Sequence, residues 1–591
     1  MRLPSIHFLT ATVVLAVGFF TEPTHAEIKD SASTVLVINI DKLSRDEIVA
    51  ATAVQGIANR SEPSVFLRTV DKFWPVSFSF YPFYKERISP EMLSKFPSPD
   101  DFWLDYLGKK WGYKYKTVTD LDELVRLNLD KIKGVVRLRE FTPEALSVAA
   151  TIAGQRDLIP VSDETAMRWP ALANLPIIVD LRDRFPKDIS LEILRKVLQW
   201  AVAEYLPGSD KENAFSYFPG QFGYLTLDLA ISRRMYCYNL GHFDPKGDDL
   251  PDEAKKILMR PSPSGLSREE EHRLLDQILS HLNPYSMVWG WDQESEDGIA
   301  TTVAKYGCAV TCCTANNLSF YLRVPSHQEM MPRQRQLKES DVKVEDKYYI
   351  AFVSGAGDAA HTATSLMCNG RWLYSARGKV PMNWTISPYL VEKAPGLMEC
   401  YYEMASPNDY FVNETAGYGY NHPGRLPDKF LFGYAEKIKA ASLLADTHYQ
   451  DLWWQNGIQP ESKRRDWEAA TGLNGYFFWE GPQRIVFPPG APIEISSERF
   501  FKDYWPKDDP QKTPQALAQS LMRQLADTGT QRPWFTVIYD LDPNFAAETM
   551  ALLPKDKFKA VLMDEFFMAA SKARSSIESH AVGSPPNLNG K

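Results

Sequence analysis

The chain has 591 residues, of which 44% are hydrophobic and 24% charged, a composition typical of a globular protein with full-sized cores. Typical domains span about 100–200 residues, so this length predicts three or four domains. The formal net charge is −9 and no basic bias is present, which argues against nucleic acid as a partner. Six cysteines are too few for a disulfide scaffold in a chain this long. The cluster Cys308, Cys312 and Cys313 lacks a second Cys or His pair at ligand spacing, so we expect neither a metal nor another cofactor.

The first 26 residues predict an export signal. Arg2 supplies a positive start, residues 8–20 form an almost unbroken apolar run, and Ala26 offers a small residue for cleavage. The apolar run is shorter than the roughly 20 residues that a membrane-spanning helix needs. We therefore expect cleavage after Ala26, no stable membrane insertion afterwards, and a secreted or periplasmic protein.

The N-terminal half alternates predicted strands with predicted helices. Residues 35–40 are predicted to form a strand, and Ser44 followed by Glu47 is a capping-box pattern that starts a helix. A second unit repeats this order, with a helix that Thr142 caps and in which Pro143 occupies the first turn. Further strands are predicted at residues 65–67, 134–138, 158–161 and 177–179. This alternation predicts parallel or mixed sheets packed between helices.

A polar segment with many charges, residues 325–347, is predicted to be a linker, and a new series of strands follows it. The predicted strands are residues 348–353, 384–386, 401–404, 476–479, 484–487, 535–539 and 560–563. Helical stretches around residues 429–446 and 513–527 separate several of them. Strands with intervening helices predict a (β/α) barrel or a distorted relative of one. An open doubly wound sheet would give a similar pattern.

These patterns predict an α/β fold, with N-terminal α/β domains followed by a C-terminal (β/α) barrel-like domain. The polar residues at the C-terminal end, which include Pro585 and Pro586, predict a disordered tail. The expected division is a signal peptide at 1–26, α/β subdomains at 27–110 and 111–188, a mainly helical subdomain at 189–324, the linker at 325–347, the barrel-like domain at 348–570 and the tail at 571–591.

The most specific local motif is the run Gly417-Tyr418-Gly419-Tyr420-Asn421-His422-Pro423. Its two glycines allow a tight turn and a close approach of the backbone to a ligand, although an ordinary aromatic-rich turn would have the same composition. The run resembles the Gly-x-Gly-Tyr-x-Tyr-Pro signature of the GxGYxYP family of predicted glycoside hydrolases. Further stretches resemble that family in the expected order: Gln55-Gly56-Ile57-Ala58-Asn59-Arg60, Gly290-Trp291, Glu296-Asp297, Asn317-Leu318-Ser319, Trp384-Thr385-Ile386-Ser387-Pro388, Asp409 and Asp564-Glu565-Phe566-Phe567.

Two positions depart from the family pattern. Members usually carry Ser-Asp-Gly-Asp-Asn after the first C-terminal strand, whereas this chain has Ser354-Gly355-Ala356-Gly357-Asp358-Ala359 and so lacks one acid and the asparagine. His422 also replaces the second tyrosine of the signature. The resemblance therefore allows either altered chemistry or binding without catalysis.

The resemblance implies a carbohydrate substrate, and hydrolysis of a glycosidic bond needs two carboxyl groups. In a barrel such groups lie just past the C-terminal ends of strands. The candidate catalytic residues are Asp358, Asp409 and Glu480, and Asp540 and Asp564 occupy similar places. Aromatic and imidazole side chains suit sugar binding. The candidate substrate-binding residues are Trp384, Tyr418, Tyr420, His422 and Trp479.

Two other functions remain open from the sequence. A non-catalytic carbohydrate-binding or surface-interaction protein would keep the aromatic cleft after losing one acid. A metal-dependent enzyme similar to polysaccharide deacetylases would use Asp358 and His361 as ligands, but no third ligand is identifiable.

Overall fold

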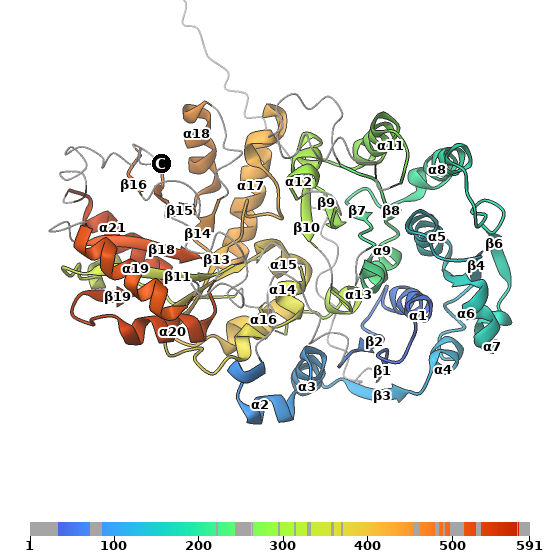
Figure 1. Ribbon diagram of the computed structural model, residues 1–591, viewed down its shortest axis with the longest axis horizontal. Helices are drawn as coiled ribbons and strands as arrows, with labels where there is room; N and C mark the ends of the chain where they lie inside the picture. The colour runs from blue at the N-terminus through green and yellow to red at the C-terminus, as the bar shows by residue number, and fades with distance from the viewer. Residues whose placement is uncertain are drawn as a thin grey trace, which may run out of the picture.

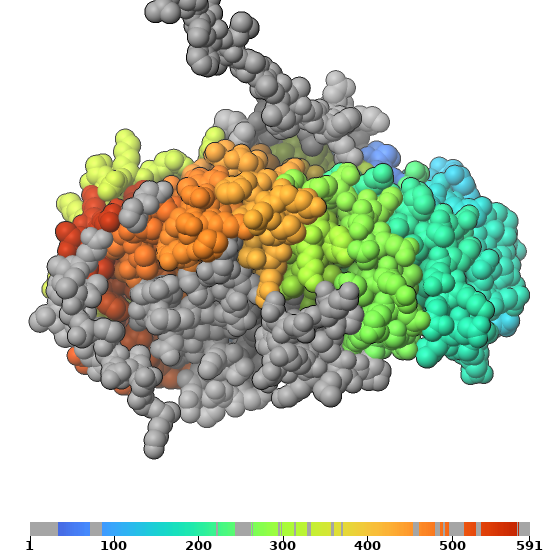
Figure 2. Space-filling view, turned by 90° about the horizontal axis from the view of Figure 1, so that it is seen from above, coloured from blue at the N-terminus to red at the C-terminus, as the bar shows by residue number. Residues whose placement is uncertain are grey.

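The computed structural model describes residues 34–70, 85–219, 223–242, 262, 264–292, 296–312, 315–327, 332–355, 360–367, 370–452, 460–478, 484–488, 491–496, 513–527, 533–539, 541–575 and 577. The expected signal peptide and the C-terminal tail lie outside these residues. The described part contains four sheets whose pairings are parallel with one exception (Figure 1). Viewed from above, the third unit, in green, lies between the second unit, in cyan, and the C-terminal domain, in orange (Figure 2).

The first sheet is three-stranded and parallel. Its order is β2-β1-β3, with β1 at Thr34–Asn39, β2 at Val65–Arg68 and β3 at Lys114–Val118. Helix α1 (Arg45–Ala58) joins β1 to β2, and both reciprocal bonds of the predicted Ser44–Glu47 capping box are present. All residues of α1 from Glu47 onward are buried, so α1 is a central helix of the molecule. The helices α2 (Pro90–Lys95) and α3 (Pro99–Trp111) precede β3.

The second sheet is also three-stranded and parallel. Its order is β5-β4-β6, with β4 at Gly134–Leu138, β5 at Leu158–Ser162 and β6 at Ile177–Asp180. Thr142 caps helix α5 (Pro143–Arg156) and Pro143 lies in its first turn, as the sequence predicts. The short helices of this unit are α4 (Leu121–Arg126), α6 (Asp163–Arg168) and α7 (Pro170–Ala173).

The third unit, expected to be mainly helical, also contains a four-stranded parallel sheet. The order is β10-β9-β7-β8, with β7 at Asn213–Ser216, β8 at Tyr236–Tyr238, β9 at Met287–Gly290 and β10 at Ala309–Cys312. Strands of three or four residues are too short to show a recognisable alternation of apolar and polar residues in the sequence. The helices are α8 (Leu191–Tyr205), α9 (Leu227–Ser232), α11 (Arg268–His281), α12 (Glu296–Lys305) and α13 (Leu318–Tyr321).

The C-terminal domain contains the largest sheet, in the order β16-β17-β15-β14-β13-β12-β11-β18, with β19 also paired to β11. Only β16 is antiparallel among the strands described. The strands are β11 (Tyr348–Ser354), β12 (Met382–Ile386), β13 (Asp409–Asn413), β14 (Tyr449–Asp451), β15 (Gly475–Phe478), β16 (Arg484–Val486), β17 (Ile493–Ser496), β18 (Trp534–Tyr539) and β19 (Phe558–Ala560).

The parallel strands of this sheet follow chain order around an incomplete ring. No strand pairing joins β17 to β18 among the described residues, although Cα atoms of the two strands approach within 8 Å. The domain is therefore barrel-like without a continuous hydrogen-bonded closure. The helices between the strands are α14 (Ala360–Thr364), α15 (Pro388–Lys393), α16 (Pro395–Met404), α17 (Asp428–Ala445), α18 (Glu461–Thr471), α19 (Pro514–Asp527) and α20 (Pro543–Leu552), and α21 (Met563–Lys572) follows β19.

Within the C-terminal domain, one predicted strand is wrong and three strands were not predicted. Residues 401–404 end helix α16, because Pro395 opens a helix there and buries its apolar residues against the sheet. The unpredicted strands are β13, β14 and β17. The described part of the expected linker contains a short 3-10 helix at Glu339–Asp341. It is bound to the C-terminal domain, since the Gln334 side chain bonds to both backbone groups of Phe411.

The two faces of the C-terminal sheet belong to different apolar clusters. One face packs with α21, and we call it the α21 face; its residues include Tyr349, Ala351, Val353, Tyr410, Val412, Tyr449, Phe477, Phe535, Val537 and Tyr539. The other face joins a cluster that continues into the N-terminal units. None of the described helices has the length and apolarity to cross a membrane.

Candidate functional site

Two carboxylates lie side by side at the C-terminal edge of the largest sheet. Asn413 of β13 pairs in parallel register with Gln450 of β14, so the next residues along the two strands, Glu414 and Asp451, are neighbours. The Glu414 amide continues the sheet by donating to the Ile386 carbonyl at 3.0 Å. Neighbouring strands are about 4.8 Å apart, so these two carboxylates start from backbone positions in close proximity.

Strand alternation directs the side chains of both residues toward the α21 face. Val412 and Tyr449 belong to that face, and side chains alternate along a strand, so Glu414 and Asp451 point the same way. Their exposed fractions are 1% and 0%. The Thr415 hydroxyl donates to Asp451 Oδ2 at 3.1 Å. The rings of Phe566 and Phe567 in α21 contact Phe535 and Tyr449 near the opposite, N-terminal ends of the strands.

Neighbouring strands contribute further groups at this edge. Thr385 of β12 donates to the Ser354 carbonyl of β11 at 3.1 Å. A Cβ at Gly355 would lie 2.5 Å from the Tyr539 ring, so only glycine lets that ring pack over the end of β11. Helix α14 carries His361, where burial lowers the pKa to about 3 and keeps the imidazole neutral. The edge therefore gathers carboxylates, hydroxyls and a phenol at the position where ligands bind in (β/α) barrels.

The signature loop connects the C-terminal domain to the third unit. Tyr420 forms an antiparallel bridge with Val310 of β10, with N–H donors at 2.6 and 2.8 Å. Gly417 and Gly419 adopt left-handed φ values of 76° and 69°. A Cβ at Gly417 would lie 2.3 Å from Gln450 Oε1, and one at Gly419 would lie 2.7 Å from the Met287 methyl. Each glycine thus lets the loop touch a different sheet.

The two tyrosines of the loop contact different parts of the molecule. Tyr418 is buried against Tyr389 of α15 and Tyr434 of α17, which makes it a packing residue of the C-terminal domain. Tyr420 packs against Trp291, and its hydroxyl donates to Glu296 Oε1 at 2.9 Å.

His422 is brought next to Tyr420 but is itself buried. Its ring meets Tyr420 edge-on with centroids 5.6 Å apart, and its exposed fraction is 1%. Tyr420 and His422 are therefore in contact with each other, whereas Tyr418 packs against helices α15 and α17.

Asp409 and Trp384 lie away from the carboxylate pair. Asp409 is the first residue of β13, at the N-terminal end of the strand, and not past a strand end as expected. Its carboxylate accepts bonds from Arg377 at 2.8 Å, from the Trp384 indole at 2.8 Å and from the Ser406 hydroxyl at 2.7 Å. Trp384 is fully buried and packs edge-on against Trp372. Asp409 therefore occupies a structural position at the opposite edge of the sheet, and Trp384 is a buried packing residue in the middle of β12.

Three predicted site residues, Asp358, Trp479 and Glu480, lie outside the described residues, as does Asp540. Asp564 is described and forms a two-bonded ion pair with Arg335. Among the described residues, no group of three or more His, Cys, Asp or Glu side chains is placed to hold a metal, and Cys308 is a buried free thiol.

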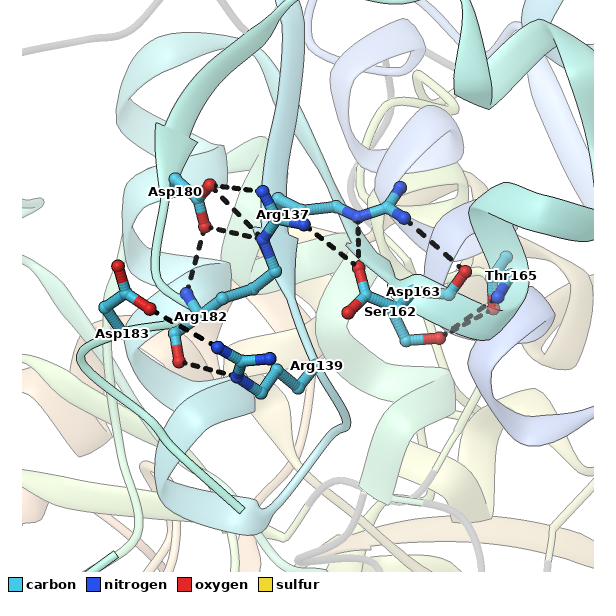
Figure 3. A network of polar contacts seen from close by, with 8 residues as sticks. All are labelled: Arg137, Arg139, Ser162, Asp163, Thr165, Asp180, Arg182 and Asp183. Carbon is cyan, nitrogen blue, oxygen red and sulfur yellow. Dashed lines mark hydrogen bonds and ion pairs between the residues drawn. The ribbon is translucent and has the colours of Figure 1, made fainter.

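A second polar cluster lies at the C-terminal edge of the β5-β4-β6 sheet (Figure 3). Arg137 pairs with Asp163 at 2.8 Å, Arg182 with Asp180 at 2.6 Å and Arg139 with Asp183 at 3.3 Å. Because each cation already faces an anion, the network ties strand ends together and offers no excess charge to a ligand.

The fold and site define a multi-domain α/β protein with a barrel-like C-terminal domain and a carboxylate-bearing edge. A crystal structure described as a putative hydrolase from Bacteroides thetaiotaomicron VPI-5482 is similar over 92% of this chain and 95% of its own, with a TM-score of 0.70 and 17% identity. A structure described as a putative polysaccharide deacetylase from Mycobacterium smegmatis aligns over 42% of this chain and 96% of its own, with a TM-score of 0.26 and 12% identity.

Family models match the C-terminal half. The model described as "GxGYxYP putative glycoside hydrolase C-terminal domain" matches residues 346–571, and that of the "GxGYxYP third domain" matches residues 254–322. The chain belongs to the GxGYxYP family, as its motifs predict. No curated protein sequence matches it.

Sequence reasoning missed Glu414 and Asp451. Each stands at the end of a strand that was not predicted, and β14 has only three residues. The available signal was the pair of dipeptides Asn413-Glu414 and Gln450-Asp451, each of which follows a short aromatic or apolar run.

Proposed function

We propose that the protein is an exported carbohydrate-active enzyme that hydrolyses glycosidic bonds with Glu414 and Asp451 as its carboxyl pair. The observation that carries the proposal is the parallel pairing of Asn413 with Gln450, which puts the following residues, Glu414 and Asp451, at the C-terminal ends of adjacent strands. Hydrolysis needs one protonated carboxyl group to assist the leaving oxygen and one carboxylate as nucleophile or base. Asp358 and Glu480 remain further candidates, because they follow β11 and β15 in the sequence.

Adjacent strands favour a short distance between the two carboxyl groups. Retaining enzymes place them about 5–5.5 Å apart and inverting enzymes about 6.5–9.5 Å apart. The backbones of neighbouring strands are about 4.8 Å apart, and both side chains point to the same face of the sheet. We therefore infer the short carboxyl–carboxyl distance of a retaining enzyme. Tyr420 and His422 lie in the same loop as Glu414 and are each 1% exposed, so they support the site from within the protein.

The test uses a panel of plant, algal and host glycans, scored for hydrolysis and for binding. Glu414→Gln and Asp451→Asn should each lower turnover by about 10²–10⁴-fold while binding persists, because the amides keep the shape but lose the proton chemistry. Glu392→Gln on the exposed surface of α15 is the matched control and should keep full turnover. Full turnover in both site variants would refute the carboxyl pair, and binding without turnover by the unmodified protein would favour a non-catalytic carbohydrate-binding function.

A further inference from the structure

The C-terminal edge of the third unit's sheet lies next to the signature loop. The strands β7, β8 and β9 end at Ser216, Tyr238 and Gly290, and the Tyr420–Val310 bridge attaches the loop to β10 of the same sheet. Ligands of parallel α/β sheets bind beyond the carboxyl ends of their strands. Side chains from two domains therefore meet at one edge, and the residue that follows β9 is Trp291.

Ser216 hydrogen-bonds to both the N–H and the carbonyl of Trp291. Its N–H donates to the Ser216 carbonyl at 3.2 Å, and its own carbonyl accepts the Ser216 hydroxyl at 3.0 Å. Gly290 has a φ of 103°, and a Cβ there would lie 1.9 Å from the Ser216 oxygen. Only glycine permits this turn, so the position of the indole is fixed by the ends of two strands.

A buried hydrogen-bonded chain holds the next residue. Asp292 Oδ2 lies 3.0 Å from His242 Nδ1, and His242 Nε2 lies 3.0 Å from the Tyr238 hydroxyl. Burial raises the pKa of Tyr238, so its phenol stays protonated within this chain. The exposed fractions of Asp292 and His242 are 5% and 0%. This chain fixes the backbone on the far side of Trp291.

The indole itself is accessible and lies among polar groups. Trp291 is half-buried, and its ring stacks on Tyr420 with centroids 6.2 Å and planes 23° apart. Glu296, at the start of α12, is exposed and accepts the Tyr420 hydroxyl. A rigid aromatic face beside a carboxylate matches a pyranose ring, whose C–H face packs on the indole while its hydroxyls donate to the carboxylate.

We propose that the third unit contributes a saccharide-binding subsite in which Trp291 is the stacking platform and Glu296 accepts hydrogen bonds from sugar hydroxyls. The inference rests on the proposed function, since it assigns a further sugar of the same substrate to this subsite. Tyr420 joins the subsite to the loop that begins at Glu414. The substrate is therefore a chain of several sugars that spans two domains.

The test measures binding of the same glycan panel to the full chain. Trp291→Ala should weaken binding of the glycans that the unmodified protein recognises by at least about tenfold, through lost stacking area. Trp291→Phe keeps an aromatic face and should retain most of the binding, which separates lost stacking from misfolding. Glu296→Gln should weaken binding by a smaller factor. Trp200→Ala, a half-buried tryptophan on α8, is the control and should bind as the unmodified protein does.

The outcomes separate the subsite from the proposed reaction. Unchanged binding by Trp291→Ala, in a protein that turns the glycan over, overturns the subsite alone. Weakened binding by Trp291→Ala, in a protein without turnover, supports the subsite and overturns the reaction. No binding and no turnover on any glycan overturn both.

Discussion

At the scale of single residues, Asp409 is a buried carboxylate held by structural partners. It bonds to Arg377, Trp384 and Ser406. Asp409→Ala removes the anion that pairs with Arg377 and the acceptor of the Trp384 indole N–H, so we expect the free energy of unfolding to fall by about 3–5 kcal/mol. Chemical denaturation measures this loss. Turnover per folded molecule should persist, because this residue lies at the edge opposite Glu414.

The control for this prediction is an exposed ion pair. Asp105→Ala removes the pair with Lys109, whose side chain is 63% exposed, and should change stability by only about 0–1 kcal/mol. If Asp409→Ala kept full stability but lost turnover, the result would contradict a structural role and indicate that Asp409 is catalytic.

Single-residue predictions from sequence depend on knowing where each strand begins. The sequence predicts a strand at residues 401–404 with Asp409 after it, whereas those residues end helix α16 and the strand starts at Asp409 itself. Tyr420 and His422 lie two residues apart in a constrained loop, which keeps their ring centroids 5.6 Å apart. The contact of Tyr420 with Trp291 and Glu296 joins distant parts of the chain, and no local pattern encodes it.

At the scale of elements, the signature loop depends on backbone conformations that favour glycine. Gly419→Ala places a methyl group at a φ of 69° and 2.7 Å from Met287. The left-handed conformation costs about 1–2 kcal/mol for a residue with a Cβ, and displacement of Met287 adds to it. We expect thermal denaturation to show a loss above that range.

Gly112→Ala is the matched control for the loop. Gly112 has the same φ of 69°, but nothing lies within 4 Å of its Cβ position, so only the conformational cost applies. The difference between the two variants measures how tightly the loop packs on β9. Equal losses in both variants would show that the loop does not depend on this contact.

Elements with strong end signals were predictable, and very short strands were not. The caps of α1 and α5 and the long strands β1, β11 and β18 appear where the sequence places them. The strands β8 and β14 have three residues each, too few to display alternation. Their positions are set by pairing with neighbours, which is a property of the assembled sheet. For this reason the carboxylate pair emerges only from strand register.

At the scale of the whole molecule, Trp103 of α3 joins three units. Its indole N–H donates to the Thr364 carbonyl at 2.7 Å, and its ring meets Tyr321 of the third unit and Tyr401 of α16 edge-on. The side chain is fully buried. One tryptophan thus packs the first unit against helices of the C-terminal domain, including α14, which carries His361.

Removal of this side chain should loosen more than its own helix. Trp103→Ala creates a cavity and leaves the Thr364 carbonyl unpaired, with an expected cost of about 3–5 kcal/mol. Hydrogen exchange should rise in α3 and also in α14 and α16, since all three lose a common contact. Trp467→Ala is the control, because this equally buried tryptophan packs on Tyr476 inside the C-terminal domain and its loss should raise exchange only around α18 and β15. Faster exchange confined to α3 in Trp103→Ala would show that the units are stabilised independently, and the site would then depend on the C-terminal domain and its contact with the third unit alone.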